Sequence, residues 1–156
     1  MATCEELNLE VVRIDAYPQE AITLPVGYTQ KRTVPASALT LSGQPLSLSL
    51  REQTGNVKSV RSEDAAGPLF TNTIQWQADD TSATTLAQIH ALETADYHFI
   101  VYTYGGKRRL IYNEDANGRT HADINTSDEE TANLSYTIHS RLPVLLVESG
   151  EWRVES

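Results

Sequence analysis

The stretch YTYGGKRRLIYNEDANGR, residues 102–119, holds the densest set of potential ligand-binding groups in the chain. A Gly-Gly pair precedes three cations, a composition that could cradle a phosphate. A phosphate-binding loop, however, needs a glycine-rich turn that leads from a strand into the N-terminus of a helix. Here the strand-like run RLIYN follows the glycines, and the motif GxxxxGK[ST] is absent from the sequence. The pattern therefore predicts a hairpin and not a phosphate site.

The acidic cluster behind that hairpin resembles the start of a calcium-binding loop. Residues 113–118 match N-x-D-x-N-G, which places oxygen ligands at alternate positions and a glycine at the turn. The twelfth position is Ile124, where such a loop needs a bidentate glutamate, and strand-like segments flank it instead of helices. We therefore expect an Asn-Gly turn between strands, no metal site and no cofactor.

Other residue types that perform catalysis show no recognisable spacing. The four histidines lack a metal-binding repeat such as H-x-x-x-H, and the run Asp128-Glu129-Glu130 is typical of a solvated loop. G-x-S-x-G is absent, although a Ser-His-Asp triad is assembled in space and can escape detection in a sequence. We expect no catalytic residues and hence a protein that is not an enzyme, with a small hydrolase kept as a third hypothesis.

The hairpin prediction specifies a register. Gly105-Gly106 suits the positive φ angles of a two-residue turn. The predicted pairs are Tyr104 with Lys107, Tyr102 with Arg109, Val101 with Leu110, Ile100 with Ile111, and Phe99 with Tyr112. Apolar side chains then meet deep in the hairpin, and tyrosines meet cations at its end. We expect the cationic tip, Lys107, Arg108 and Arg109, to be an assembly interface.

Period-two alternation dominates the rest of the chain and predicts half-buried strands. The alternating sets are Leu7, Leu9 and Val11 opposite Val12 and Ile14, then Leu46, Leu48 and Leu50, then Phe70, Ile74 and Trp76, then Leu134, Tyr136 and Ile138. We therefore expect one mainly β domain over residues 1–156, a two-sheet β-sandwich or barrel-like fold with about eight to eleven strands.

Residues 81–96 are the exception to this alternation. Leu86, Ile89 and Leu92 recur at helical spacing behind polar residues suited to an N-cap. This pattern predicts one short helix over residues 82–94. His90 lies next to the apolar face, so we expect a partly buried structural histidine there.

Two further segments carry candidate interface residues. Residues 16–38 contain three prolines together with Leu24, Val26 and Tyr28, which suits either an arm that lies on another subunit or a long loop packed on its own domain. Trp152 has a large apolar surface close to the C-terminal end, and either folds back on the core or anchors a neighbour.

Charge and composition limit the classes of function. Twenty-one acidic residues against twelve basic ones give a net charge of −9, which repels a nucleic-acid backbone. The first residues, MATCEELNLE, lack the basic and apolar regions of a secretory signal, and no apolar run approaches the length that spans a bilayer. We expect synthesis in a reducing cytoplasm and no contact with a membrane.

The order of these features resembles small virion proteins of tailed phages and prophages of Bacteroidetes hosts. The resemblance covers roughly residues 46–148 and lies in SVRSEDAAGPLFTNTIQWQ, HFIVYTYGGKRRLIYN and NLSYTIHSRLPVLLVE. These segments fit the loose patterns A-G-x-x-F/Y-x-x-x-I/L-x-W/F and G-x-x-R-L-I/L. The resemblance implies a structural component of the tail or neck in the virion, made in the host bacterial cytoplasm, with no catalytic residues.

Two hypotheses about function follow. The first is a virion subunit that forms a homo-oligomeric ring or tube with other virion proteins, with DNA at most passing through its lumen. The second is a monomeric β-sandwich module that binds a peptide or small ligand. The interface candidates of the first hypothesis are Lys107, Arg108, Arg109, Leu24, Val26, Tyr28 and Trp152.

Overall fold

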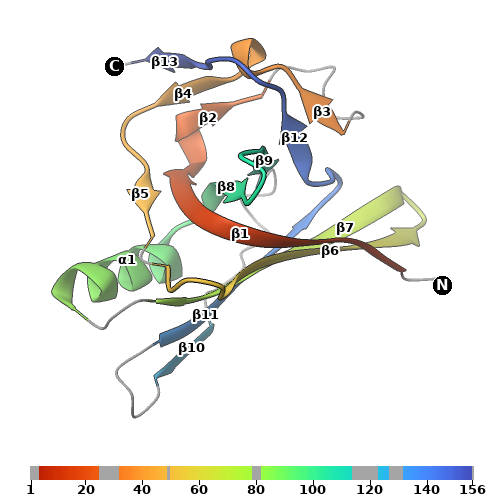
Figure 1. Ribbon diagram of the computed structural model, residues 1–156. Helices are drawn as coiled ribbons and strands as arrows, with labels where there is room; N and C mark the ends of the chain where they lie inside the picture. The colour runs from red at the N-terminus through yellow and green to blue at the C-terminus, as the bar shows by residue number, and fades with distance from the viewer. Residues whose placement is uncertain are drawn as a thin grey trace.

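The computed structural model describes residues 4–24, 32–48, 50–78, 82–113, 123–126 and 132–155, which form two sheets and one helix (Figure 1). The large sheet follows the path β10 (Asp123–Thr126), β11 (Ala132–Ser140), β7 (Gly67–Ala78), β6 (Gly55–Asp64), β1 (Cys4–Pro18), β8 (Tyr97–Thr103), β9 (Arg108–Ile111), β12 (Leu145–Val147) and β3 (Thr33–Val34), and β5 (Leu46–Ser47) also pairs with β1. The small sheet contains β13 (Arg153–Glu155), β4 (Thr40–Ser42) and β2 (Ile22–Thr23).

A mainly β fold with two sheets and one helix is therefore confirmed. The predicted number of strands was too low, because these ranges contain thirteen. The additional ones are strands of two or three residues, such as β2, β3 and β13. Such short pairings leave no alternating pattern in the sequence.

Strand β1 belongs to both halves of the large sheet, and it crosses the middle of the molecule as a long arc (Figure 1). Residues 4–11 pair with β6, whereas residues 11–18 pair with β8. The register with β8 shifts between Val11 and Arg13, which marks a bulge. The extra residue places both Val11 and Ile14 in the core and leaves Val12 44% exposed. The predicted strict alternation, with Val12 and Ile14 on one face, was therefore wrong.

Two hydrophobic clusters lie on opposite faces of the sheet around β8. Tyr97, Phe99 and Val101 point into the first cluster, together with Ile74 and Trp76 of β7 and others. Ile100 of β8 points into the second cluster, which the residues of the small sheet complete. β8 is thus buried on both faces, which explains its almost continuous apolar sequence.

The helix α1 (Ala83–Thr94) matches the predicted range closely. Ser82 caps it, because its hydroxyl accepts a hydrogen bond from the amide of Thr85 at 3.4 Å. Ile89 and Leu92 are buried as predicted, but Leu86 is 50% exposed and His90 is exposed as well. The predicted partly buried histidine at position 90 was therefore wrong. No described helix is long and apolar enough to cross a membrane.

The described parts of the 16–38 segment pack on the chain's own domain. Residues 16–18 continue β1, and two short 3₁₀ turns, Gln19–Ala21 and Ala36–Ala38, flank the strands β2 and β3. Ile22 and Val34 are buried in the second cluster. These residues therefore fit the loop interpretation and not the arm.

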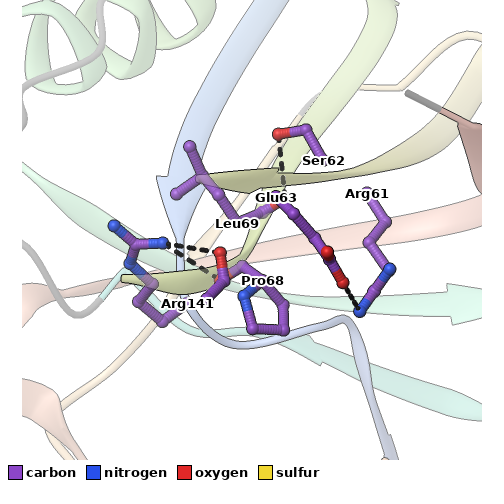
Figure 2. A network of polar contacts seen from close by, with 7 residues as sticks. Arg61, Ser62, Glu63, Pro68, Leu69 and Arg141 are labelled. Atoms are coloured by element: carbon purple, nitrogen blue, oxygen red, sulfur yellow. Dashed lines mark hydrogen bonds and ion pairs between the residues drawn. The ribbon is translucent and has the colours of Figure 1, made fainter. Parts of the chain in front are cut away.

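The long β6–β7 hairpin projects from the sheet and ends in a two-residue connection between the paired residues Asp64 and Gly67 (Figures 1 and 2). Arg141, from the segment after β11, donates to the carbonyl oxygens of Gly67 and Pro68 at 3.2 Å each. Arg61 pairs with Glu63 at 2.7 Å. Figure 2 shows these contacts side by side; the Arg141 bonds tie the start of β7 to the segment after β11, whereas the Arg61–Glu63 pair lies within β6.

A buried histidine, His98, joins β8 to the two chain segments beside it. Its Nδ1 accepts a hydrogen bond from the amide of Asn113, and its Nε2 donates to the carbonyl of Gln19, both at 2.8 Å. Its ring stacks on Tyr112 with centroids 4.2 Å apart. This arrangement requires the neutral ring, and burial lowers the pKa of His98 to about 4.

We predict that stability falls in mild acid because of His98. The folded-state pKa lies below the ordinary value of 6.5, so the unfolded chain takes up the proton first as the pH drops through that range. The free energy of unfolding should decrease by roughly 2 kcal/mol between about pH 7.5 and about pH 5 from this group alone. Guanidinium titrations at both pH values measure it. His98→Gln should flatten the dependence, whereas His90→Gln should leave it unchanged; equal slopes in all three proteins would contradict the assignment.

Gly55, the first residue of β6, allows β1 and β6 to approach each other closely. A Cβ atom at this position would lie 2.7 Å from the carbonyl oxygen of Val11 and 3.3 Å from Leu50 Cδ1. Gly55→Ala should therefore lower the free energy of unfolding by about 1–3 kcal/mol. Gly105→Ala, at a position with no neighbour within 4 Å, is the matched control and should change stability little. Equal effects would contradict the close approach.

Candidate assembly surface

The β8–β9 hairpin exists, but its register differs by one residue from the prediction. Tyr102 pairs with Arg108 and Val101 pairs with Arg109. The connection has three residues, because the amide of Gly106 donates to the Thr103 carbonyl and the Thr103 amide donates to Lys107, each at 3.0 Å. Gly106 has a φ of +75°, which fits a type I turn closed by a left-handed glycine.

This shift decides the face on which each cation lies, because a slip of one residue exchanges the two faces of a strand. Arg108 lies on the face of Tyr102, and Arg109 lies on the opposite face beside Val101 and Leu146. The Nε of Arg109 is buried without a hydrogen-bond partner in the described part of the chain. Lys107 is exposed at the tip. The three cations therefore do not form one docking tip.

Arg108 instead fixes the C-terminal tail. Its guanidinium donates to the carbonyl oxygens of Glu148 and Gly150, both at 2.9 Å. The same group lies over the ring of Trp152, 4.6 Å from the centroid. Trp152 is half-buried against the second cluster, so it folds back on its own chain.

A second cation–aromatic pair continues the first on the same face. Arg13 of β1 lies 4.8 Å from the ring centroid of Tyr102, and Tyr102 is the cross-strand partner of Arg108. Arg13, Tyr102, Arg108 and Trp152 thus form a cation–aromatic row that runs across three strands and onto the tail. The side chain of Arg13 is 56% exposed, and Tyr102 and Trp152 are half-buried. The row is therefore open to a partner.

Asp15 holds the β1 end of this row. Its carboxylate is buried, pairs with the Arg13 guanidinium at 3.0 Å and accepts a hydrogen bond from Ser47 at 3.1 Å. Burial, followed by the nearby Asp15 charge, raises the pKa of Tyr17 to about 12 and also raises the pKa of Tyr102. Both tyrosines therefore remain neutral hydrogen-bonding and stacking groups at ordinary pH.

The tail beside this row carries an exposed apolar residue and a hollow. Val154 is 71% exposed on β13, and Tyr104 is 60% exposed at the end of the hairpin. The hollow, of about 330 Å³, is lined by Arg108, Gly150, Glu151, Trp152 and Val154. Aromatic, apolar and cationic side chains thus meet where the hairpin contacts the tail.

Only part of the predicted interface comes together here. Lys107, Arg108 and Trp152 lie at the same end of the hairpin, while Leu24 is partly buried against the second cluster. Val26 and Tyr28 fall outside the described residues. Sequence reasoning missed Arg13 and Tyr102 as partners, although the alternation of Arg13 and Asp15 along a predicted strand was a usable signal.

The chemistry of the described residues includes no group of three histidine, cysteine, aspartate or glutamate side chains that could hold a metal ion. Most of the N-x-D-x-N-G stretch falls outside those residues. Its first member, Asn113, is buried, and its side-chain amide donates to the Tyr97 carbonyl at 3.4 Å.

We predict that Arg108 holds the C-terminal tail in place. Arg108→Ala removes two hydrogen bonds from a charged donor and one cation–π contact. The free energy required to open the tail locally should therefore fall by roughly 1–2 kcal/mol. Hydrogen exchange at the amides of β13 measures this opening. Lys107→Ala, the neighbouring cation without such contacts on the tail, is the matched control. Unchanged protection in Arg108→Ala would contradict the role.

Comparison with known proteins adds no template for this surface. No protein-family model matches the chain, and no curated protein and no solved structure matches it either. The cation–aromatic row and the neighbouring tail therefore have to be interpreted from their own chemistry.

Proposed function

We propose that this chain is a non-enzymatic structural subunit of a tailed-phage virion that assembles into a ring or tube in the tail or the head–tail neck. The observation that carries the proposal is the cation–aromatic row. Arginine, tyrosine and tryptophan dominate the binding energy of protein–protein interfaces. Four such residues, Arg13, Tyr102, Arg108 and Trp152, lie together and partly open to solvent.

The charge distribution supports contact between unlike surfaces. The end of the β8–β9 hairpin carries charges of both signs, because Lys107 and Arg108 lie beside Glu148 and Glu151, and Arg13 is paired with Asp15. Such a mixed surface suits a partner surface that also carries both signs, and Lys107, exposed at the tip, is the cation best placed to meet an acidic residue of the next subunit. Such head-to-tail contacts generate closed rings when the rotation between subunits closes.

Open strand edges supply a second means of association. β13 pairs only with β4 in the described part of the small sheet, so its other edge is unpaired there, and its residue Val154 is exposed. Unpaired edges of this kind accept a strand from another chain. In the proposed ring, a neighbouring subunit adds a strand to the β13 edge. The cation–aromatic row contacts that same neighbour.

The same proposal assigns the remaining partners and location. The acidic surface suits a lumen through which DNA passes without binding, because it repels the phosphate backbone. The subunit is made in the host bacterial cytoplasm and ends in the virion, next to other virion proteins. No membrane, metal ion or cofactor takes part.

We predict a closed oligomer in solution, measured by size-exclusion chromatography with light scattering. Lys107→Glu should shift the protein toward monomers, and more strongly at low salt, because exposed charges are screened over about 10 Å at 0.1 M salt. Lys58→Glu is the matched control, because it makes the same charge reversal on the outer face of the sheet, the face of β6 that points away from the first hydrophobic cluster. It should leave the oligomer intact. A protein that stays monomeric at high concentration would rule the proposal out.

The second candidate is a monomeric β-sandwich module that binds a peptide or small ligand. A hollow lined by uncharged polar residues on the outer face of β7 and β11 favours it. This candidate predicts a monomer whose state responds to neither charge reversal.

A further inference from the structure

The outer face of β6, β7 and β11 carries rows of short polar side chains. Lys58, Thr73 and Thr137 form one cross-strand row, with Thr73 and Thr137 hydroxyls 3.3 Å apart. Asn56, Gln75 and Ser135 form the next row, and Gln77 pairs with Asn133 beyond it. The row of Asn56, Gln75 and Ser135 is uncharged, and acidic residues continue it only on the flanking strands, Glu10 of β1 opposite Asn56 and Asp123 of β10 opposite Ser135.

A hollow of about 480 Å³ opens on this face. It is lined by Thr54, Gln75, Trp76, Gln77, Asn133, Leu134 and Ser135. Trp76 and Leu134 are cross-strand partners buried in the first cluster, so they contribute main chain to the floor. The side chains around that floor are amides and hydroxyls, and none of the described lining residues is charged.

The wall on the β7 side is held in place by reciprocal hydrogen bonds. The Arg51 amide donates to the Gln77 carbonyl at 2.9 Å, and the Gln77 amide donates to the Thr54 hydroxyl oxygen at 3.2 Å. That hydroxyl in turn donates to the Arg51 carbonyl at 2.5 Å. The loop of residues 51–54 is thus tied to the strand before any ligand arrives, which lowers the entropy cost of binding.

The polar groups of the hollow have unused hydrogen-bonding capacity. The side-chain amides of Gln75, Gln77 and Asn133 and the hydroxyl of Ser135 make no hydrogen bond to described protein atoms, and Gln75 and Asn133 are exposed. Each amide offers two donors and one acceptor oxygen, and the hydroxyl offers both functions. The hollow therefore suits a ligand that both donates and accepts at several adjacent positions without a charge.

We propose that this hollow binds a neutral saccharide unit. A sugar presents adjacent hydroxyl groups, each able to donate and accept, and the hollow has the volume of a small-ligand site. An anion would find no cation on the lining, and an apolar ligand would find no exposed apolar side chain there. An extended peptide binds best along a strand edge, whereas this hollow lies on the face of the sheet. The proposal holds whether or not the chain forms a ring.

Nuclear magnetic resonance tests this directly. ¹H–¹⁵N spectra of the full chain should be recorded during titration with lactose, maltose and N,N′-diacetylchitobiose, with sialyllactose as a charged comparison. The side-chain amide signals of Gln75, Gln77 and Asn133 should shift with at least one neutral sugar. The affinity should be millimolar, because the lining has no exposed aromatic ring among the described residues and each hydrogen bond replaces one to water.

Paired variants make the test specific. Gln75→Ala combined with Asn133→Ala should raise Kd by about tenfold or more, since each lost hydrogen bond contributes roughly 1 kcal/mol. Lys58→Ala on the same face is the matched control and should bind as the parent does. Gln75 and Asn133 are both exposed, so thermal unfolding of the double variant should confirm that the fold persists. The proposal is overturned if no neutral sugar shifts these signals or if only sialyllactose does.

Discussion

The bulge in β1 is the constraint on which the rest of the structure depends. One extra residue at Val12 lets a single strand pair with β6 along its first half and with β8 along its second. It also keeps Val11 and Ile14 on the same inner face although they are three residues apart. Without that residue, either Val11 and Ile14 would no longer both face the first cluster, or the pairing of β1 with β8 would change register. Both halves of the large sheet are therefore joined through one local irregularity.

The same bulge places the charged residues of β1. Beyond it, Arg13, Asp15 and Tyr17 alternate with the core residues Ile14 and Ala16 and face the second cluster. Asp15 is buried there, and a buried carboxylate is costly unless it is paired and hydrogen-bonded. Arg13 and Ser47 supply those partners. Because Asp15 holds the Arg13 guanidinium, the cation–aromatic row begins at a fixed point.

Features that depend on local sequence were predictable. The helix follows from its cap and apolar spacing, and β7 and β11 follow from the alternation of residues such as Ile74 and Tyr136. Features that depend on distant pairing were not. The Gly105-Gly106 pair is compatible with loops of two or three residues, and only the contacts of β9 with β12 and β8 distinguish them. The resulting slip of one residue placed Arg109 opposite Tyr102 in the prediction, where the structure has Arg108.

Short segments were missed for a related reason. β3 and β13 are two and three residues long, and each pairs in parallel with a strand far away in the sequence. Alternation cannot be recognised over such lengths. The positions of these strands are instead determined by tertiary contacts around the second cluster. Val34 and Ile22 fill the second cluster, and this burial organises the 16–38 segment despite its prolines.

The outer face of the large sheet is chemically divided, and the division explains where the exposed sites lie. Its inner face is apolar along β11, β7, β1 and β8, since one cluster contacts all four strands. Its outer face is apolar under the small sheet, where Ile100 and Leu110 are buried. Where no described element covers it, the rows of threonine, asparagine, glutamine and serine replace the apolar side chains. The cation–aromatic row begins on β1 between these two regions, and arginine and tyrosine suit that place because their apolar parts can pack while their polar ends stay in water.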